Sequence, residues 1–211
     1  MQPAESARPA LPGAGRPRRR KAVFLDRDGT LTEPRHYPAH PDELVLMPDI
    51  GAPLRTLQEE GFALVVVTNQ SGVARGLFDA TVLDAMHDRL RALLDRQGIR
   101  LDAIHACPHH PEGRVPRYRL VCRCRKPAPG MLLQAARDLD LDLTRSWMVG
   151  DSPCDVAAGR RAGTRTALVG ARVDGHAGPD VTGATTSEVL HRVAAAHHRS
   201  LPRSAGPRLW A

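Results

Sequence analysis

The sequence predicts an α/β fold built on a doubly wound, mainly parallel sheet with helices on both faces. Short apolar segments of strand length alternate with longer segments in which apolar residues recur at helical spacing. The apolar segments contain few polar residues, which is typical of strands covered on both faces. The clearest example is residues 22–25, AVFL, which end abruptly at Asp26 and Asp28. Acids at the carboxyl end of such a strand are expected at the sheet edge where ligands bind.

The segments that follow continue this alternation. Four prolines within residues 26–48 exclude regular structure from the first loop. A helix is expected at 49–60, because apolar residues fall on one face and Gly61 follows as a stop. Residues 62–67 form an uninterrupted apolar run and predict the second strand. The stretch 68–76, TNQSGVARG, is expected to be a glycine-rich loop.

The remaining elements are predicted from the same signals. Asp79 is a helix cap, and a helix with apolar residues at helical spacing is expected at 80–97. A third strand is expected at 99–106 and a long irregular loop at 107–126. The last expected elements are a helix at 129–139, a strand at 147–149, a helix at 156–162, a strand at 166–169 and a helix at 187–196.

The 211-residue chain has a net charge of +7, and its positive charge is concentrated at the two ends. Residues 1–21 hold six basic side chains against one acid, and residues 191–211 hold four against none. We therefore expect disordered basic tails at 1–20 and 199–211 around one domain at 21–198. The near-neutral remainder argues against a nucleic-acid partner. No apolar run resembles a signal peptide or is long enough to cross a bilayer, so a cytoplasmic location without a membrane partner is expected.

Polar side chains gather at the ends of three predicted strands. Acids collected at one sheet edge repel one another, so their clustering predicts a cation among them, and carboxylate oxygens with a phosphate ligand suit Mg²⁺. A lysine and a threonine nearby would hold phosphate oxygens, and the assembly predicts phosphoryl transfer. The residues concerned are Asp26, Asp28, Thr68, Asn69, Arg125, Lys126, Asp151 and Asp155.

The long loop also predicts a structural zinc site. Its pattern is C-x-H-x12-C-x-C, with the ligands Cys107, His109, Cys122 and Cys124. Disulfides are disfavoured in a reducing compartment, and His110 is an alternative to His109 as the fourth ligand. Four protein ligands leave no open position for chemistry, so the zinc would order the loop and bring Arg125 and Lys126 over the substrate. Cys154 is left over, packed or exposed beside Asp155.

Four motifs in order resemble those of the haloacid dehalogenase (HAD) superfamily of phosphatases: FLDRDGT, TN after an apolar strand, a Lys before Pro, and GDSPCD. The resemblance implies a HAD-like Rossmannoid fold without a large cap domain. It also implies a hydrolase in which Asp26 is the nucleophile that forms an aspartyl-phosphate and Asp28 is the general acid and base. Mg²⁺ would be bound by the Asp26 carboxylate, the Asp28 backbone carbonyl and the Asp151 carboxylate, with Asp155 behind them. Thr68 and Lys126 would bind the phosphoryl group, and Asn69 and Arg125 would contact substrate.

Within the superfamily, CPHHP, CRCRKPAPGM and TNQSGVARG resemble the heptose-bisphosphate phosphatases. The histidinol-phosphate phosphatases share the zinc ligands, but the resemblance gives them a shorter loop than the twelve residues found here. Arg125 also favours a small sugar bisphosphate, because a guanidinium clamps a second phosphate. A nucleic-acid 3′-phosphatase and a non-enzymatic zinc-organised binding module are the remoter alternatives. The resemblance implies a monomer.

Overall fold

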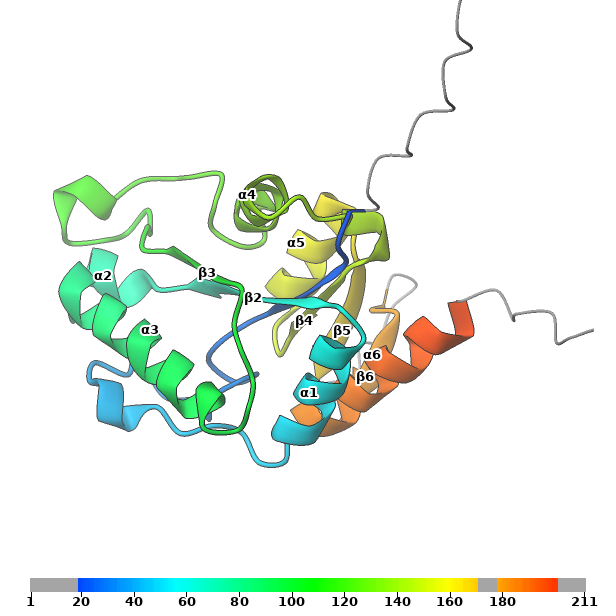
Figure 1. Cartoon of the computed structure of the whole chain (residues 1–211). Helices are drawn as coiled ribbons and strands as arrows, with labels where there is room; N and C mark the ends of the chain where they lie inside the picture. Colours follow the sequence, from blue (N-terminus) through cyan, green and yellow to red (C-terminus); the bar gives the residue numbers. More distant parts are fainter. Residues whose placement is uncertain (1–18, 171–177, 201–211) are drawn as a thin grey trace, which may run out of the picture.

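The structure, a computed structural model, describes residues 19–170 and 178–200, so the predicted tails lie almost wholly outside the described residues. Six parallel strands form one sheet in the order β3-β2-β1-β4-β5-β6 (Figure 1). The strands are β1 (Ala22–Leu25), β2 (Ala63–Asn69), β3 (Ala103–Cys107), β4 (Trp147–Gly150), β5 (Arg165–Val169) and β6 (Val181–Gly183). This arrangement confirms the predicted doubly wound parallel sheet.

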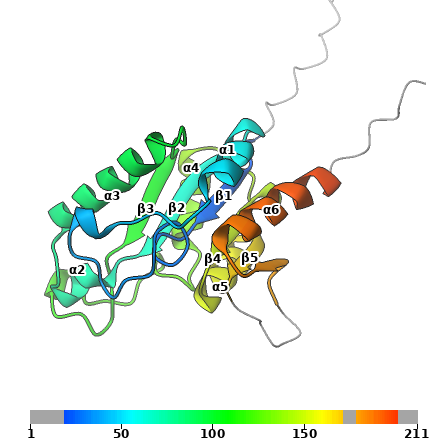
Figure 2. The same ribbon diagram turned by 90° about the horizontal axis from the view of Figure 1, so that it is seen from below.

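Helices cover both faces of the sheet. Figures 1 and 2 show α4 (Gly130–Asp138) and α5 (Pro153–Ala162) on one face, with α1 (Gly51–Glu59) and α6 (Thr186–Ser200) on the other. The helix α3 (Ala80–Asp95) packs into the same core as α1 and α6. No helix of the described residues is long and apolar enough to cross a membrane.

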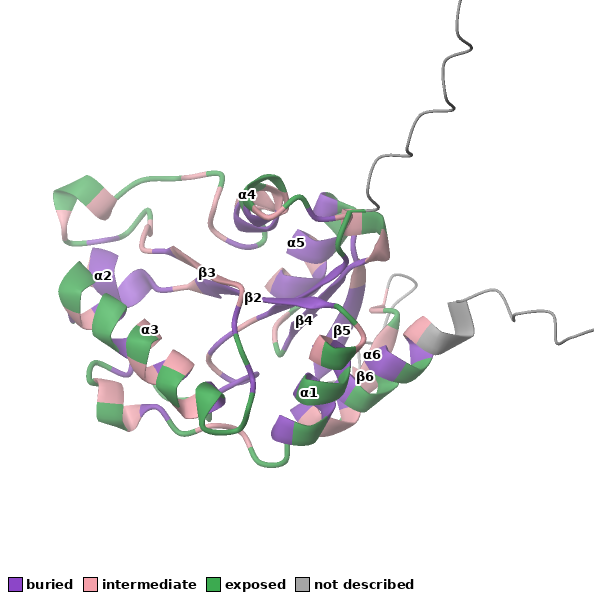
Figure 3. Ribbon diagram, viewed as in Figure 1, coloured by how far each residue is buried: buried purple, intermediate pink, exposed green. Residues whose placement is uncertain are grey.

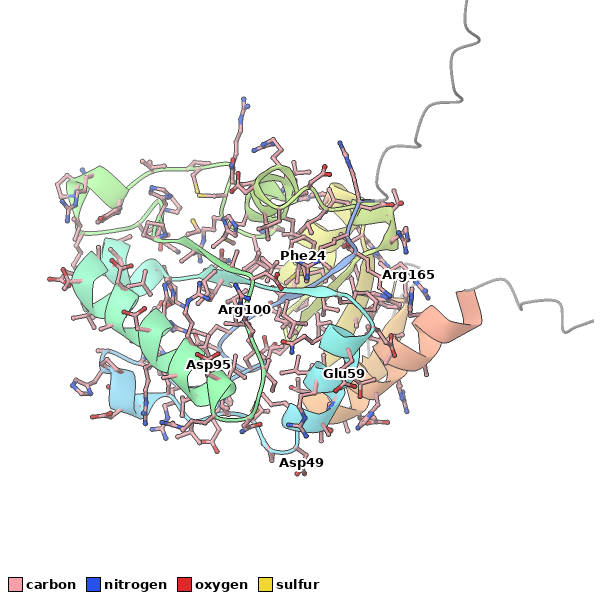
Figure 4. The ribbon with its side chains drawn as sticks, in the orientation of Figure 1. Phe24, Asp49, Glu59, Asp95, Arg100 and Arg165 are labelled. Atoms are coloured by element: carbon pink, nitrogen blue, oxygen red, sulfur yellow. The ribbon has the colours of Figure 1, made fainter. Side chains whose placement is uncertain are left out.

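Alternate residues of the central strand serve two separate cores. Val23 and Leu25 pack towards α1, α3 and α6, whereas Ala22 and Phe24 pack towards α4 and α5. All four side chains are fully buried, and Figure 3 shows the inner strands in purple. In Figure 4 Phe24 lies in the middle of the sheet. This two-sided burial explains why β1 is apolar at every position rather than at every second one.

Some predicted boundaries were wrong. The glycine-rich stretch contains a short helix, α2 (Ser71–Arg75), and the first loop contains a 3-10 turn, Pro41–Glu43. The structure begins α1 at Gly51 because Asp49 has a positive φ of 58°, which a helix does not tolerate. The short edge strand β6 has no counterpart in the prediction.

The strand order places a topological switch point at the centre of the sheet. β1 has β2 on one side and β4 on the other, so successive connections turn in opposite directions between β1 and β4. Ligands of open α/β sheets bind at this point, outside the carboxyl ends of the strands. The amide of Asp26 donates to the carbonyl of Val149 across it, with a 3.0 Å N–O distance. Loops after β1, β2 and β3 stand at this edge, and the described residues include no separate cap lobe there.

Candidate active site

The acids predicted at the sheet edge converge in the structure. Asp26 follows β1, Asp151 follows β4, and Asp155 lies in the first turn of α5. A carboxylate oxygen from each of the three lies within 4.8 Å of the others. Asp155 is held by a capping box, in which its Oδ2 accepts from the Ser152 amide at 3.1 Å. The helix start therefore delivers a fully buried carboxylate beneath the other two.

Lys126 is buried among these acids. Its Nζ forms ion pairs with Asp26 Oδ1 at 2.9 Å and with Asp155 Oδ1 at 2.6 Å, and it donates to the carbonyl oxygen of Val67 at 2.8 Å. Burial acts to lower the pKa of Lys126, but the charges of Asp26 and Asp155 outweigh it and raise the pKa, so the ammonium stays charged. Burial raises the pKa of Asp155 to about 6 against the opposing charge of Lys126. The Lys126 ammonium thus contacts two carboxylates and one carbonyl oxygen, and it offsets the negative charge of the acids.

The end of β2 fixes the backbone of this lysine. The Asn69 side chain donates to the Lys126 carbonyl and accepts from the Lys126 amide, both at 3.0 Å. Asn69 is expected to contact substrate, and in the structure both polar groups of its side chain also hydrogen-bond the Lys126 backbone. Thr68 is buried, and its hydroxyl oxygen accepts from Gln70 Nε2 at 2.8 Å. That contact leaves the Thr68 hydroxyl hydrogen available to a ligand.

Two residues that the sequence analysis did not single out contact Asp28. Arg27 forms a two-pronged ion pair with the Asp28 carboxylate, and Gln70 donates to the same carboxylate. The sequence did carry a signal for Arg27, because a charged residue between two acids at the end of a buried strand needs a partner. Gln70 directly follows the TN motif, where its side chain enters the site.

The carboxylates fit a hard divalent cation. Burial of the carboxyl group and the nearby charge of Asp26 raise the pKa of Asp151. A Cβ on Gly29 would lie 2.1 Å from Asp151 Oδ2, so only glycine lets this carboxylate approach the turn after β1. Asp26 accepts both of its recorded hydrogen bonds, from Lys126 and from the Arg27 amide, on Oδ1. Asp26 Oδ2 and the Asp151 carboxylate are thus available to a ligand.

The second predicted cluster also comes together. Sulfur atoms of the three cysteines lie 3.1 to 3.5 Å apart, and His109 Nδ1 is 3.7 Å from Cys107 Sγ and 3.4 Å from Cys124 Sγ. Sulfurs around a tetrahedral zinc ion lie ~3.8 Å apart, so a small expansion fits that metal. All four cysteines are free, and burial raises the pKa of the Cys107 thiol. A metal cation would offset the cost of ionising it.

His110 is turned away from this cluster. Its Nδ1 accepts from the Glu112 amide at 3.1 Å, and its Nε2 lies 3.3 Å from Arg75 Nη2. Burial, together with the charges of Arg125 and Arg75, lowers the pKa of His110. The geometry therefore favours His109 over His110 as the fourth ligand, and it groups His110 with Arg75 and Arg125 as a basic cluster formed by α2 and the loop after β3.

Comparison with known proteins identifies relatives of this chain. A family model described as "HAD-hyrolase-like" matches residues 123–198. The D-glycero-beta-D-manno-heptose-1,7-bisphosphate 7-phosphatase of Rhodopseudomonas palustris is 45% identical over 145 residues, which are 69% of this chain and 81% of the relative. The protein of the same name from Escherichia coli K12 is 43% identical over 70% of this chain and 78% of its own length.

A solved structure with the same fold carries ligands. It is the D,D-heptose 1,7-bisphosphate phosphatase from B. bronchiseptica complexed with magnesium and phosphate. Its TM-score against this chain is 0.71 at 32% identity, and the match covers 83% of this chain and 99% of that one.

Proposed function

The chain belongs to the HAD-like phosphatase family that includes these heptose-bisphosphate phosphatases, and from this membership we propose that it removes the 7-phosphate of D-glycero-D-manno-heptose 1,7-bisphosphate. The observation that carries the proposal is the arrangement of Asp26, Asp151 and Asp155 around the buried Lys126, at the point of the sheet where ligands bind. Such a site suits a dianionic group transferred to a carboxylate.

Asp26 acts as the nucleophile. Its Oδ1 is held by Lys126 and by the Arg27 amide, while Oδ2 has no recorded donor among the described residues. Oδ2 attacks phosphorus, the bond from phosphorus to the sugar oxygen breaks, and an aspartyl-phosphate forms. Water then attacks that phosphorus, breaks the bond to Asp26 and releases inorganic phosphate.

Asp28 moves the protons of both steps. It gives a proton to the leaving alkoxide oxygen in the first step and takes one from the attacking water in the second. The Thr68 hydroxyl donates to an oxygen of the phosphoryl group. Lys126 balances the negative charge of Asp26, because its ammonium forms ion pairs with Asp26 and Asp155 and donates to the Val67 carbonyl.

Two metals complete the proposal. Mg²⁺ would be held by the carboxylates of Asp26 and Asp151 and by the Asp28 carbonyl oxygen, and it would supply positive charge that screens the phosphate from the acids. Zn²⁺ would be held by Cys107, His109, Cys122 and Cys124 and would order the loop. The donor types fit each metal, because hard oxygens suit magnesium while thiolates and imidazole suit zinc.

The basic cluster supports a second phosphate on the substrate. Arg75, His110 and Arg125 lie together beside the zinc ligands, and the Arg125 amide donates to Cys122 Sγ at 3.3 Å. Arg125→Ala is expected to raise KM for the bisphosphate by ~10-fold and to leave KM for a monophosphate within ~2-fold. Equal effects on both substrates would remove Arg125 from substrate recognition.

A phosphate-release panel tests the proposal. Heptose 1,7-bisphosphate, histidinol phosphate and a 3′-phosphorylated oligonucleotide are compared by kcat/KM with Mg²⁺ present, and Asp26→Asn sets the background. The expected preference is for the bisphosphate by at least ~100-fold. A preference for histidinol phosphate would instead support the phosphatases that share the zinc pattern. Absence of Mg²⁺-dependent release with every substrate would support a binding module.

A further inference from the structure

Arg27 is a buried charge that the proposed chemistry does not use. Its Nε donates to Asp28 Oδ1 at 2.9 Å, and its Nη2 donates to Asp28 Oδ2 at 2.8 Å. The side chain of Arg27 is 0% exposed. A two-pronged contact from a buried guanidinium fixes both the position and the plane of the carboxylate it meets.

Gln70 closes this contact into a triangle. Its Oε1 accepts from Arg27 Nη2 at 2.9 Å, and its Nε2 donates to Asp28 Oδ2 and to Thr68 Oγ1, both at 2.8 Å. Gln70 is itself 4% exposed. Both ends of its amide are therefore occupied, and its orientation is set by Arg27 on one side and by Thr68 on the other.

Exposure distinguishes the members of this triangle. The side chain of Asp28 is 27% exposed, whereas Arg27 and Gln70 are shielded behind it. Arg27 Nε and Nη2 already donate to protein oxygens, and Nη1 is buried away from solvent. Arg27 is thus unable to reach a phosphate from this position, which excludes the usual role of an active-site arginine. Of these three side chains, only the Asp28 carboxylate is exposed to a substrate at this edge of the sheet.

We propose that Arg27 and Gln70 are positioning residues that hold the Asp28 carboxylate where it exchanges protons with the leaving oxygen and with water. The inference rests on the proposed function, because it needs Asp28 to be the acid and base. A free aspartate side chain has several rotamers, and a group held in one of them meets the reacting oxygen more often. The position of the Asp28 carboxylate would then be set by Arg27, its neighbour in sequence, and by Gln70, which follows β2.

The test uses the leaving group of the reaction. An alkyl phosphate needs a proton on its leaving alkoxide, whereas p-nitrophenyl phosphate releases a stable anion that needs none. The readout is the single-turnover rate of leaving-group release, which precedes the attack of water in which Asp28 serves both substrates alike. Gln70→Ala and Arg27→Lys are expected to lower this rate ~10- to 100-fold for the alkyl phosphate, with the rate for p-nitrophenyl phosphate within ~3-fold of the parent. Gln70→Ala keeps the Arg27–Asp28 pair and decides the test if Arg27→Lys does not fold.

Two reference variants separate the possible failures. Gln134→Ala removes an exposed glutamine of α4 and should leave both rates unchanged. Asp28→Asn should show the same selective loss as the positioning variants. Equal losses on both substrates, or no loss with the alkyl phosphate, in Gln70→Ala would overturn the positioning role while Asp28→Asn stays selective. A non-selective Asp28→Asn would instead contradict the proposed role of Asp28.

Discussion

His87 is expected to make the protein lose stability as the pH falls from 7 to 5. It lies on α3, and its Nε2 is buried without a hydrogen-bond partner among the described residues. Burial, followed by the positive charge of Arg27, lowers the pKa of His87 from 6.5 to about 4. Arg91 adds to this effect, and the acids of the same helix, Asp84 and Asp88, oppose it without reversing it.

The sign and size of this stability change follow from the difference in the pKa of His87 between the folded and unfolded chains. Between pH 6.5 and about 4 the unfolded chain binds a proton at His87 that the folded chain does not, so folding stability falls as the pH falls. The full difference would correspond to roughly 3 kcal/mol below both pKa values, and about 2 kcal/mol of it is reached at pH 5. Because the ring is only partly shielded from solvent, we expect ~1–2 kcal/mol at pH 5.

Urea unfolding at pH 7.5 and pH 5 measures this loss. The parent and His87→Gln are compared, so that other groups that titrate in this range cancel in the difference between the two proteins. His36→Gln, which changes an exposed histidine, is the matched control and should keep the parental pH dependence. If the parent and His87→Gln lose the same free energy of unfolding between the two pH values, the reasoning from burial is wrong.

Three further predictions concern the site. Asp26→Asn should leave the circular dichroism spectrum unchanged and lower kcat at least ~1,000-fold, since no other described carboxylate is placed to replace the nucleophile. Cys122→Ser should lower zinc content measured by atomic absorption together with activity, while Cys154→Ser keeps full zinc. Gly29→Ala should lower kcat ~10-fold or more, because its Cβ would meet Asp151 Oδ2, whereas Gly61→Ala has a similar φ of +82° with open space around it and should keep kcat.

The fold was largely predictable because strands buried on both faces appear in the sequence as short runs of consecutive apolar residues. β1 was predicted at its observed bounds, as four consecutive apolar residues have few other uses. The helix α2 was missed because Gly72 and Gly76 indicate a loop. In the structure Gly72 lies within this helix, and only glycine fits there because a Cβ would lie 2.3 Å from the Phe78 ring. Gly76 ends the helix with a φ of +72°. Position 72 requires glycine because of its tertiary contact with Phe78, which the sequence spacing does not reveal.

The edge strand β6 illustrates a different limit. It has only three residues, Val181–Gly183, and none of them is fully buried. Its place in the sheet depends on pairing with β5 and on Asp180, which accepts from the amide and the hydroxyl of Thr166 at 2.7 and 3.1 Å. A local pattern cannot report a strand whose stability comes from its neighbour.

The cluster of acids and the Cys/His cluster were predictable because the chemistry of metal ligands limits the residue types that serve. Gln70 was not, because glutamine is usually a surface residue, and only the geometry shows that it is buried behind Asp28. The position of Arg27 between two acids indicates that it has a partner, but only the geometry shows that it is buried. Asn69 shows the reverse case. Its place beside Thr68 predicts a substrate contact, whereas its hydrogen bonds to the Lys126 backbone are visible only in the structure.

The loop after β3 and the catalytic edge share Lys126, so we expect the proposed zinc site and catalysis to be interdependent. Cys122 accepts from the Arg125 amide, and the next residue, Lys126, is fixed by Asn69 and reaches Asp26 with its Nζ. Disorder in this loop would therefore disturb the charge beside the nucleophile as well as the basic cluster. Zinc removal should then lower kcat in addition to raising KM, whereas Arg125→Ala should raise KM alone. If zinc removal raised KM and left kcat intact, Lys126 would be held in place by Asn69 without help from the loop.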